Sequence, residues 1–207
     1  MGRRSYAGAQ SAAALGTGAN ASGVVSTAVG NGAKASALGA SALGNTADAS
    51  GRGSMAFGYA SKASAVDALA TGSNANASSM NAVAVGKNSN SSAVNAIALG
   101  TSSNVSGVSA VVIGNQAKGT HENSVTLGSY SSSAANDFDK TAKALSYFGD
   151  KSSVTVNYNG TSSTQKGAVS VGDGKLVRQI QNVGAGRITA ESTDAVNGSQ
   201  LYQAYYN

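Results

Sequence analysis

The stretch Asn81-Ala82-Val83-Ala84-Val85-Gly86-Lys87-Asn88-Ser89-Asn90 is one unit of a pattern that returns every 14 residues. Its glycine is the most regular member, because the same spacing separates nine successive glycines. Alanine stands two places before seven of them, and Val, Leu, Ile, Phe or Thr stands directly before each. A fixed repeat of this length predicts a stacked architecture in which each unit contacts only its neighbours. The nine glycines occupy positions 16, 30, 44, 58, 72, 86, 100, 114 and 128.

Each unit has the pattern of two short strands and two turns. Val83 and Val85 alternate with small residues, which is the two-residue period of a strand. Polar residues typical of a turn follow the glycine, and then comes a second alternation of the form Ala75-Asn76-Ala77. A helix is excluded, because every unit contains glycine and clusters of Ser and Asn. The sequence therefore predicts an all-β fold, a parallel β-solenoid (β-roll) of 14-residue coils.

Such a thin coil is expected to need a partner. A circuit of 14 residues leaves a narrow lumen. We expect side chains from two facing strands to fill it, with Val or Leu on one strand and Ala on the other. The aliphatic side chains of one coil offset only part of the entropy lost on ordering it. We therefore predict a homo-oligomer whose axis runs parallel to the solenoid. The sequence leaves open whether the Ala stripe or the Val/Leu stripe faces that axis.

Composition and charge exclude several classes of protein. The net charge is +5, but the basic residues of the repeats are scattered and aromatic residues make up only 5% of the chain, so no nucleic-acid partner is predicted. The chain has no cysteine, which excludes disulfides and thiolate metal sites. It shows neither a signal peptide nor an apolar run of membrane-spanning length. We expect a piece of a longer protein whose membrane anchor lies outside these residues.

The repeat is interrupted after Gly128 and returns once, at Gly167-Ala168-Val169-Ser170-Val171-Gly172. We therefore expect head repeats over residues 1–134, an insertion over 135–166 and a final coil over 167–172. The insertion holds bulky residues such as Phe138 and Tyr147, and a strand-like run over 154–158 that ends in a turn signal. We expect it to cap or clamp the end of the solenoid, with contact to a ligand as the alternative.

The residues after the final coil carry a resemblance to a known family. The string Arg178-Gln179-Ile180, then Asn182-Val183-Gly184-Ala185-Gly186, then Thr193-Asp194-Ala195-Val196-Asn197-Gly198-Ser199-Gln200-Leu201 resembles the neck of YadA-like trimeric autotransporter adhesins. The 14-residue units resemble the head repeats of the same family. The resemblance implies a left-handed β-roll head, homotrimeric, with a neck over 173–202 and the start of a coiled-coil stalk over 203–207. Independently of the resemblance, Thr193-Asp194 is a plausible start for a helix.

The resemblance also implies a function, which is attachment of a bacterium to its host. Multivalent binding to matrix proteins (collagen, fibronectin or laminin) or to host cell receptors is expected, with the protein at the bacterial surface and its anchor in the outer membrane. An ice-binding solenoid or a purely structural spacer are the alternatives, although no array of Thr supports the first. No ligand-binding residue is predicted. The neck residues with an expected structural role are Arg178, Gln179, Ile180, Asn182, Gly186, Thr193, Asp194, Asn197 and Leu201.

Residues for catalysis or metal binding are sparse. His121 is the only histidine, so neither a histidine-based triad nor a two-histidine metal site is predicted, and we expect it on the surface. The one close pair of acids, Asp137 and Asp139, has no calcium-loop pattern around it. No phosphate-binding glycine motif is present. We therefore predict a protein that is not an enzyme and has no cofactor or metal.

Overall fold

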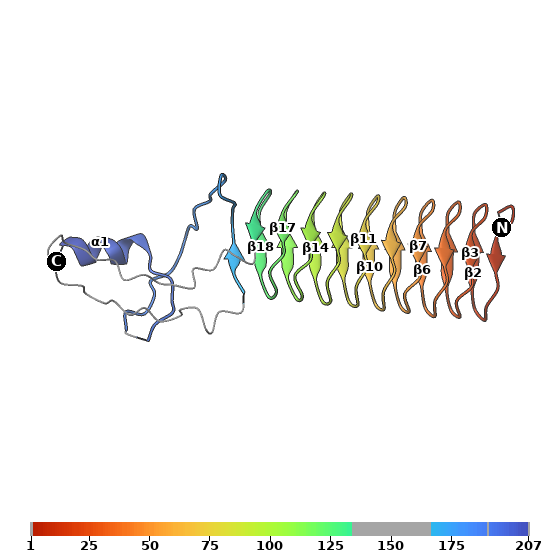
Figure 1. Ribbon diagram of the computed structural model, residues 1–207, viewed down its shortest axis with the longest axis horizontal. Helices are drawn as coiled ribbons and strands as arrows, with labels where there is room; N and C mark the ends of the chain where they lie inside the picture. The colour runs from red at the N-terminus through yellow and green to blue at the C-terminus, as the bar shows by residue number, and fades with distance from the viewer. Residues whose placement is uncertain (1, 134–166, 190, 207) are drawn as a thin grey trace. The chain divides into compact units, whose positions relative to one another are not determined.

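The computed structural model describes residues 2–133, 167–189 and 191–206 (Figure 1). These residues divide into two units: residues 2–133 with 167–177, which we call the head, and residues 178–189 with 191–206, which we call the neck. The head is a parallel β-solenoid, as the 14-residue repeat predicted. The insertion expected over 135–166, with Asp137, Asp139 and the strand-like run, lies outside the described residues.

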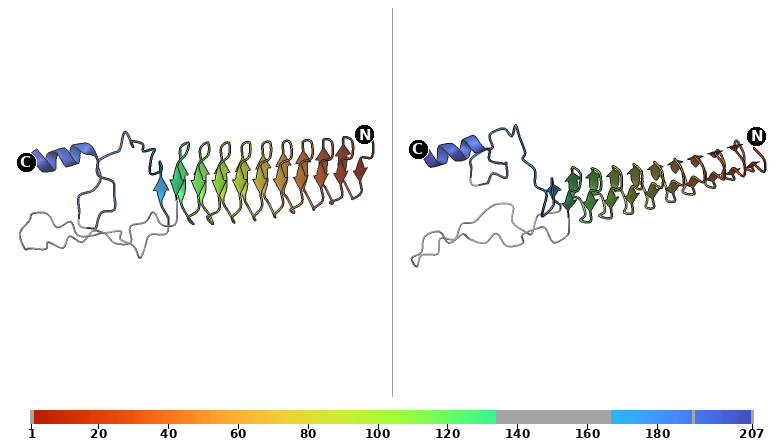
Figure 2. Two further views of the ribbon diagram at one scale, coloured as in Figure 1. Left: turned by 45° about the horizontal axis from the view of Figure 1, so that its top comes forward. Right: turned by 90° about the horizontal axis from the view of Figure 1, so that it is seen from above.

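Two parallel sheets of ten strands each form the head, and successive coils contribute one strand to each sheet (Figure 2). Sheet A contains β1 (Tyr6–Ala7), β3 (Asn20–Ala21), β5 (Lys34–Ala35), β7 (Asp48–Ala49), β9 (Lys62–Ala63), β11 (Asn76–Ala77), β13 (Asn90–Ser91), β15 (Asn104–Val105), β17 (Lys118–Gly119) and β19 (Ser132–Ser133). Sheet B contains β2 (Ala13–Leu15), β4 (Thr27–Val29), β6 (Ser41–Leu43), β8 (Met55–Phe57), β10 (Leu69–Thr71), β12 (Val83–Val85), β14 (Ile97–Leu99), β16 (Val111–Ile113), β18 (Val125–Leu127) and β20 (Val169–Ser170).

The register of the strands follows the repeat. Val83 of β12 is paired with Leu69 of β10 and with Ile97 of β14, each 14 residues away. Equivalent residues of all coils therefore lie in columns along the head. The last described strand keeps this register across a longer gap, because Val169 is paired with Val125. The chain thus resumes the solenoid after residue 166.

Alanine and serine fill the interior of the coils. Ala82 and Ala84, beside and within β12, are fully buried, as are Ala75 and Ala77, beside and within the facing strand β11. Val105 and Val112 are the largest hydrophobic side chains that are completely buried among the described residues. The interior is therefore too narrow for most aliphatic side chains.

This geometry corrects one expectation from the sequence. We expected Val and Leu of one strand to share the lumen with alanines of the other, but the residue two places before the repeat glycine, alanine in seven of nine coils, points inward instead. Val83 and Val85 flank Ala84 and therefore point to the opposite, outward side of sheet B. The Val/Leu stripe is thus the one that lies on the outside of the head.

Two tight turns close each coil. Turn 1 follows the repeat glycine and leads from sheet B to sheet A, as at Gly86-Lys87-Asn88, while turn 2 leads back, as at Ser79-Met80-Asn81. Asn88 and Asn81 both have left-handed backbones, with φ of 57° and 56°. Asparagine tolerates this conformation better than most residues. Asparagine or glycine accordingly occupies many of these positions in other coils, such as Gly32, Asn74 and Asn95.

The repeat glycine is required by close stacking of the coils. A Cβ atom on Gly86 would lie 2.5 Å from the carbonyl oxygen of Gly100 in the next coil, and the φ of Gly86 is +132°. Both conditions exclude a side chain. The same contact recurs between Gly100 and Gly114, which explains why this position is the most regular in the sequence.

The neck contains one helix, α1 (Gly198–Tyr206). Asn197 caps its first turn, since its Oδ1 accepts a hydrogen bond from the backbone N–H of Gln200 over 3.2 Å. Gln200 reaches back in turn, and its Oε1 accepts from the N–H of Asn197 over 3.2 Å. This reciprocal arrangement is a capping box. The helix start expected at Thr193-Asp194 was wrong, because the capping box begins the helix at Gly198 instead.

Candidate interaction surfaces

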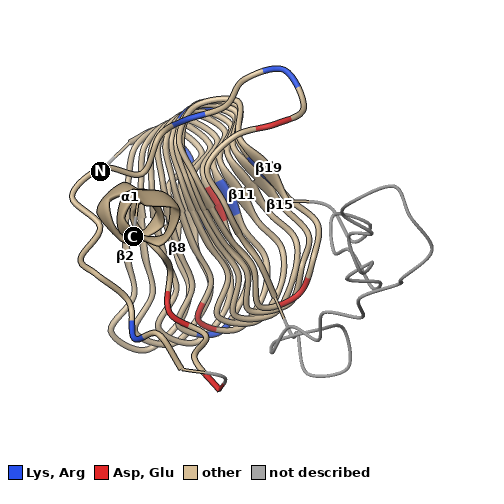
Figure 3. Cartoon of the chain, turned by 90° about the vertical axis from the view of Figure 1, so that its left-hand side faces the viewer, with Lys and Arg blue, Asp and Glu red and all other residues tan. Residues whose placement is uncertain are grey.

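The outward side of sheet B is an aliphatic face that runs the length of the head. Leu43, Met55 and Ile113 on this face are each about 40% exposed, at 41%, 40% and 41%. No charged residue occurs in any described strand of sheet B (Figure 3). One column of the face comprises Leu15, Val29, Leu43, Phe57, Thr71, Val85, Leu99, Ile113 and Leu127, and the other comprises Ala13, Thr27, Ser41, Met55, Leu69, Val83, Ile97, Val111, Val125 and Val169.

A largely apolar exposed face of this length is typical of a surface that makes contact with another molecule. Each three-residue strand of sheet B contributes its first and last residue to the face, and neighbouring strands are in register. The face is therefore repetitive and nearly flat, which suits close packing against an equally regular surface. It is the best candidate for the contact between copies of this chain.

The outward side of sheet A is polar. One residue of each strand points outward between two inward-pointing small residues, and these residues form a single column. Asp48 in this column is the ladder partner of Lys34 and of Lys62. The full column is Tyr6, Asn20, Lys34, Asp48, Lys62, Asn76, Asn90, Asn104, Lys118 and Ser132.

Three asparagines in this column form a ladder of side-chain hydrogen bonds. Asn76 Nδ2 donates to Asn90 Oδ1 over 2.8 Å, and Asn90 Nδ2 donates to Asn104 Oδ1 over 2.7 Å. The ladder fixes the orientation of these amides. Sheet A therefore exposes an ordered row of polar groups, flanked by lysines, to water or to a ligand.

The neck is held by a cluster around Gln200. Its side chain accepts from the N–H of Gly186 over 2.9 Å and donates to the carbonyl oxygen of Gly186 over 2.6 Å. Asn197 Nδ2 donates to the carbonyl oxygen of Val183 over 3.0 Å. These contacts tie residues 183–186 to the start of α1.

An exposed ion pair closes the same loop. Arg187 Nε lies 2.8 Å from Asp194 Oδ2, and the backbone N–H of Arg187 donates to the same oxygen over 3.1 Å. The side-chain hydrogen bond from Arg187 is the main cause that lowers the pKa of Asp194, and the backbone hydrogen bond adds to it. The pKa of Arg187 is raised by the same side-chain contact.

The structure brings together only some of the neck residues that the sequence singled out. Asp194, Asn197 and Gly186 take part in the contacts above. Ile180 and Leu201 are 69% and 54% exposed in the single chain. Asn182 has a left-handed backbone with φ of 59°. The structural role expected for Arg178, Gln179 and Thr193 stays a prediction.

Sequence reasoning missed two residues of this cluster, Arg187 and Gln200. Gln200 stands three residues after Asn197, which is the spacing of a capping box and was a signal that could have identified it. Arg187 had no such signal, because its partner lies seven residues away across a loop.

The described residues offer no sign of a catalytic or metal centre. No group of three His, Asp or Glu side chains in the described part of the chain is arranged to hold a metal ion. His121 lies partly exposed, with its Nδ1 2.8 Å from the carbonyl oxygen of Glu122. Among the described residues, no helix is long and apolar enough to cross a membrane.

Comparison with known proteins connects these surfaces to a family. Residues 7–33, 21–47, 49–75, 63–89, 77–103 and 106–131 match the repeat described as "YadA head domain repeat (2 copies)". Residues 179–204 match "Coiled stalk of trimeric autotransporter adhesin". These matches extend over both the head and the neck.

Two known proteins show similarity at the level of structure and sequence. The collagen-binding domain of the Yersinia adhesin YadA is similar to this chain with a TM-score of 0.70 and 26% identity, covering 92% of this chain and 89% of that one. The autotransporter adhesin BtaE of Brucella suis biovar 1 (strain 1330) is 59% identical over 44 residues, which is 21% of this chain and 6% of BtaE. The matched stretch is therefore a small part of that relative.

Proposed function

This chain belongs to the family of YadA-like trimeric autotransporter adhesins, and we propose that it forms a trimeric head through which a bacterium attaches to host extracellular matrix. The observation that carries the proposal is the contrast between the two outward faces of the head. Sheet B offers an aliphatic face suited to copies of the same chain, and sheet A offers an ordered polar face suited to a ligand. An adhesin head binds without catalysing a reaction, in agreement with the interpretation of the sequence.

Assembly is the first part of the proposal. Three copies place the outward side of sheet B toward a common axis parallel to the solenoid, so that columns such as Val83-Ile97-Val111 leave water. Burial of this apolar surface supplies the stability that one thin coil lacks. In this arrangement we expect the coils to have the left-handed sense that the resemblance implies, and the neck to lead into a coiled-coil stalk that starts over residues 203–207.

Ligand binding is the second part. The YadA domain that this chain resembles is described as collagen-binding, so collagen is the first candidate ligand here, with fibronectin, laminin and host cell receptors as the others. Three copies of sheet A on the outside of the trimer repeat the same polar column around the axis. Many weak contacts then add through effective concentration. We expect the chain to act at the bacterial surface, as part of a protein that is anchored in the outer membrane.

Two matched substitutions test the assembly. Val85→Asp places a charge on the aliphatic face, and Asn76→Asp places the same charge on sheet A. Sedimentation is expected to show a trimer for the parent chain and for Asn76→Asp, and a monomer for Val85→Asp. A stable folded monomer of the parent chain, or a trimer that tolerates Val85→Asp, would contradict the proposal.

Binding is tested on immobilised collagen, fibronectin and laminin and on host cells. The trimer is expected to bind at least one of them, and the monomeric Val85→Asp variant is expected to bind it about 10²–10⁴-fold more weakly because avidity is lost. Lack of binding to all of these surfaces by a correctly assembled trimer would leave a structural spacer as the better interpretation.

A further inference from the structure

An exposed apolar ridge runs along one edge of the head, separate from the face of sheet B. It is formed by the middle residue of turn 2, one residue from each coil. Leu38, Met80 and Val108 of this column are 51%, 49% and 48% exposed, and Val24 is 42% exposed. Three residues of the column are polar or charged: Gln10, Arg52 and Glu122. The ridge comprises Val24, Leu38, Val66, Met80, Val94 and Val108.

The opposite edge of the head has a different character. The residue of turn 1 directly after each repeat glycine is polar at eight of nine coils, and Tyr59 is the remaining one. Thr17, Asn31, Asn45, Ser73, Lys87, Thr101, Asn115 and Ser129 are the eight. Aliphatic side chains are therefore not a requirement of a tight turn in this solenoid. Something specific to the turn 2 edge accounts for them.

The ridge adjoins the aliphatic face of sheet B. Met80 is followed three residues later by Val83, the first outward residue of β12, and the same spacing joins Val94 to Ile97 and Val108 to Val111. The ridge and the face therefore form one apolar surface that extends around a single edge of the head. Because both repeat every 14 residues, the ridge and the aliphatic face run parallel to each other along the head.

We propose that this ridge is buried against the neighbouring subunit of the trimer, where it packs beside turn 1 of that subunit. The inference rests on the proposed trimer. Three parallel copies with sheet B turned inward enclose an axis, and rotation about that axis brings one edge of each copy next to the opposite edge of the following one. The turn 2 edge therefore meets a turn 1 edge at each of the three junctions.

The length of the ridge favours a second copy of the chain as its partner. Neighbouring members of the column are separated by one coil, about 4.8 Å. A globular partner would cover the ridge over only a few coils. Another copy of the solenoid has the same spacing between its coils, so it can contact the ridge over its whole length.

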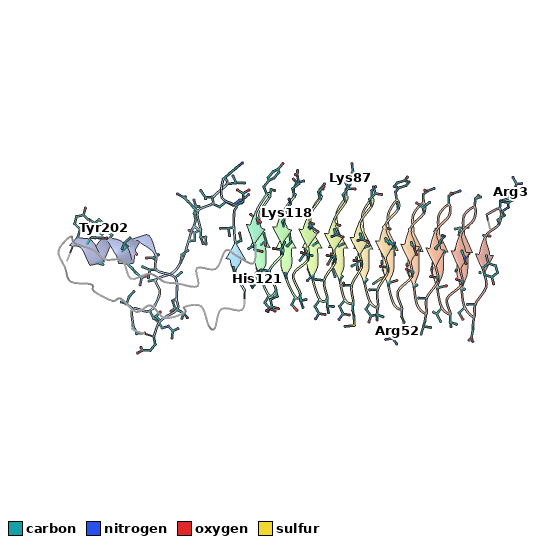
Figure 4. All side chains as sticks on the ribbon, viewed as in Figure 1. Arg3, Arg52, Lys87, Lys118, His121 and Tyr202 are labelled. Atoms are coloured by element: carbon teal, nitrogen blue, oxygen red, sulfur yellow. The ribbon has the colours of Figure 1, made fainter. Side chains whose placement is uncertain are left out.

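Engineered disulfides test this contact directly, because the chain contains no cysteine. Lys87, in turn 1, and Arg52, in the turn 2 column, lie on opposite edges of the head (Figure 4). Cysteines in turn 1 and turn 2 of the same chain therefore cannot reach each other. Any disulfide between them must join two subunits.

The test uses the pairs M80C with S73C and M80C with K87C in the full 207-residue chain. Mild oxidation is expected to convert one of these pairs into a covalently closed trimer on a non-reducing gel. The pair N76C with K87C is the control, because Asn76 faces outward from sheet A, and it is expected to stay largely uncrosslinked.

A separate variant, V85C, reports on the axis of the trimer by forming covalent dimers. Crosslinking of V85C without crosslinking of either Met80 pair, together with rapid labelling of M80C by a maleimide, would overturn the ridge contact and leave the proposed trimer intact. Absence of crosslinks at V85C and at both Met80 pairs would instead overturn the proposed arrangement of the trimer, and this inference with it.

Discussion

The side-chain amide of Asn76 donates a hydrogen bond to the Oδ1 atom of Asn90 over 2.8 Å, and the two residues are direct partners in sheet A. The side-chain amide of Asn90 donates in the same way to the Oδ1 atom of Asn104. A chain of amides at equal spacing is a direct consequence of parallel strands in exact register, because only identical residues at identical positions can repeat the same contact.

We predict that Asn90→Ala lowers the free energy of unfolding by about 1–3 kcal/mol, since it removes two hydrogen bonds worth about 0.5–1.5 kcal/mol each. Asn20 occupies the same column but makes no side-chain hydrogen bond to another described residue, so Asn20→Ala is the control. Denaturant unfolding of both variants measures the difference. Equal stability of the two variants would show that the ladder contributes nothing.

Two buried serines lead to a prediction of increased stability. The hydroxyl of Ser54 is buried without a hydrogen-bond partner among the described residues, whereas Ser89 Oγ donates to the carbonyl oxygen of Gly86 over 2.8 Å. Ala68 occupies the position of Ser54 in the next coil, so alanine fits there. Ser54→Ala is expected to stabilise the head by about 1 kcal/mol, and Ser89→Ala to destabilise it by about the same amount.

Thermal unfolding of the two serine variants compares changes of identical size in side-chain volume. A shift in the same direction for both would mean that loss of the hydroxyl, and not its hydrogen bonding, determines the outcome. That result would contradict the prediction.

The repeat glycine is predicted to be the least replaceable residue of a coil. Gly86→Ala places a Cβ atom 2.5 Å from the carbonyl oxygen of Gly100, so the stacked coils must separate locally. We expect a loss of more than about 3 kcal/mol, in the range of the most damaging substitutions. Gly18→Ala is the control: a Cβ there meets no atom within 4 Å, although its φ of +67° is left-handed. A loss of about 1 kcal/mol is expected for it.

Val25 occupies a left-handed position that suits it poorly. Its φ is 56°, while equivalent positions in other coils hold Gly39, Gly53 and Asn81. A β-branched residue is strained there. Val25→Asn is therefore expected to raise the unfolding free energy by about 1 kcal/mol. Gly39→Asn, an exchange between two residues suited to the conformation, is the control: a Cβ atom there meets only the Cα of Gly53, at 3.9 Å, so stability should change little.

The sequence predicted the path of the chain better than the direction of its side chains. The spacing of Gly16, Gly30 and the later glycines predicted a stack of 14-residue coils, and the two short alternations within each unit predicted two strands per coil. The side of sheet B that Val83 occupies was not predictable from alternation, since Ala84 and Val83 both qualify as core residues. The volume of the lumen decides it, and that volume depends on how closely the two strands approach.

The neck shows a second limit to what could be predicted from the sequence. Asn197 and Gln200 cap α1 through a local pattern that the sequence displays. Arg187 and Asp194 meet across a loop, and no periodicity places them together. Contacts that depend on loop conformation, unlike those that depend on the repeat, had to come from the structure.

The ion pair of the neck predicts a pH dependence. Arg187 lowers the pKa of Asp194 below its ordinary value of 3.8, so the pair stabilises the folded neck above that pH. The contribution is lost as the pH falls through the lowered pKa of the folded state, where Asp194 becomes protonated. Arg187 stays charged over the pH range in which Asp194 titrates, so it adds no further pH dependence.

Replacement of Arg187 isolates this effect. In Arg187→Gln the pKa of Asp194, followed by NMR titration of its carboxyl carbon, is expected to rise toward the ordinary value because both the charge and the fork-shaped donor are removed. Arg187→Lys keeps the charge and loses the two-pronged contact, so an intermediate pKa is expected. A pKa for Asp194 that is the same in all three proteins would show that Arg187 does not hold this carboxylate in solution.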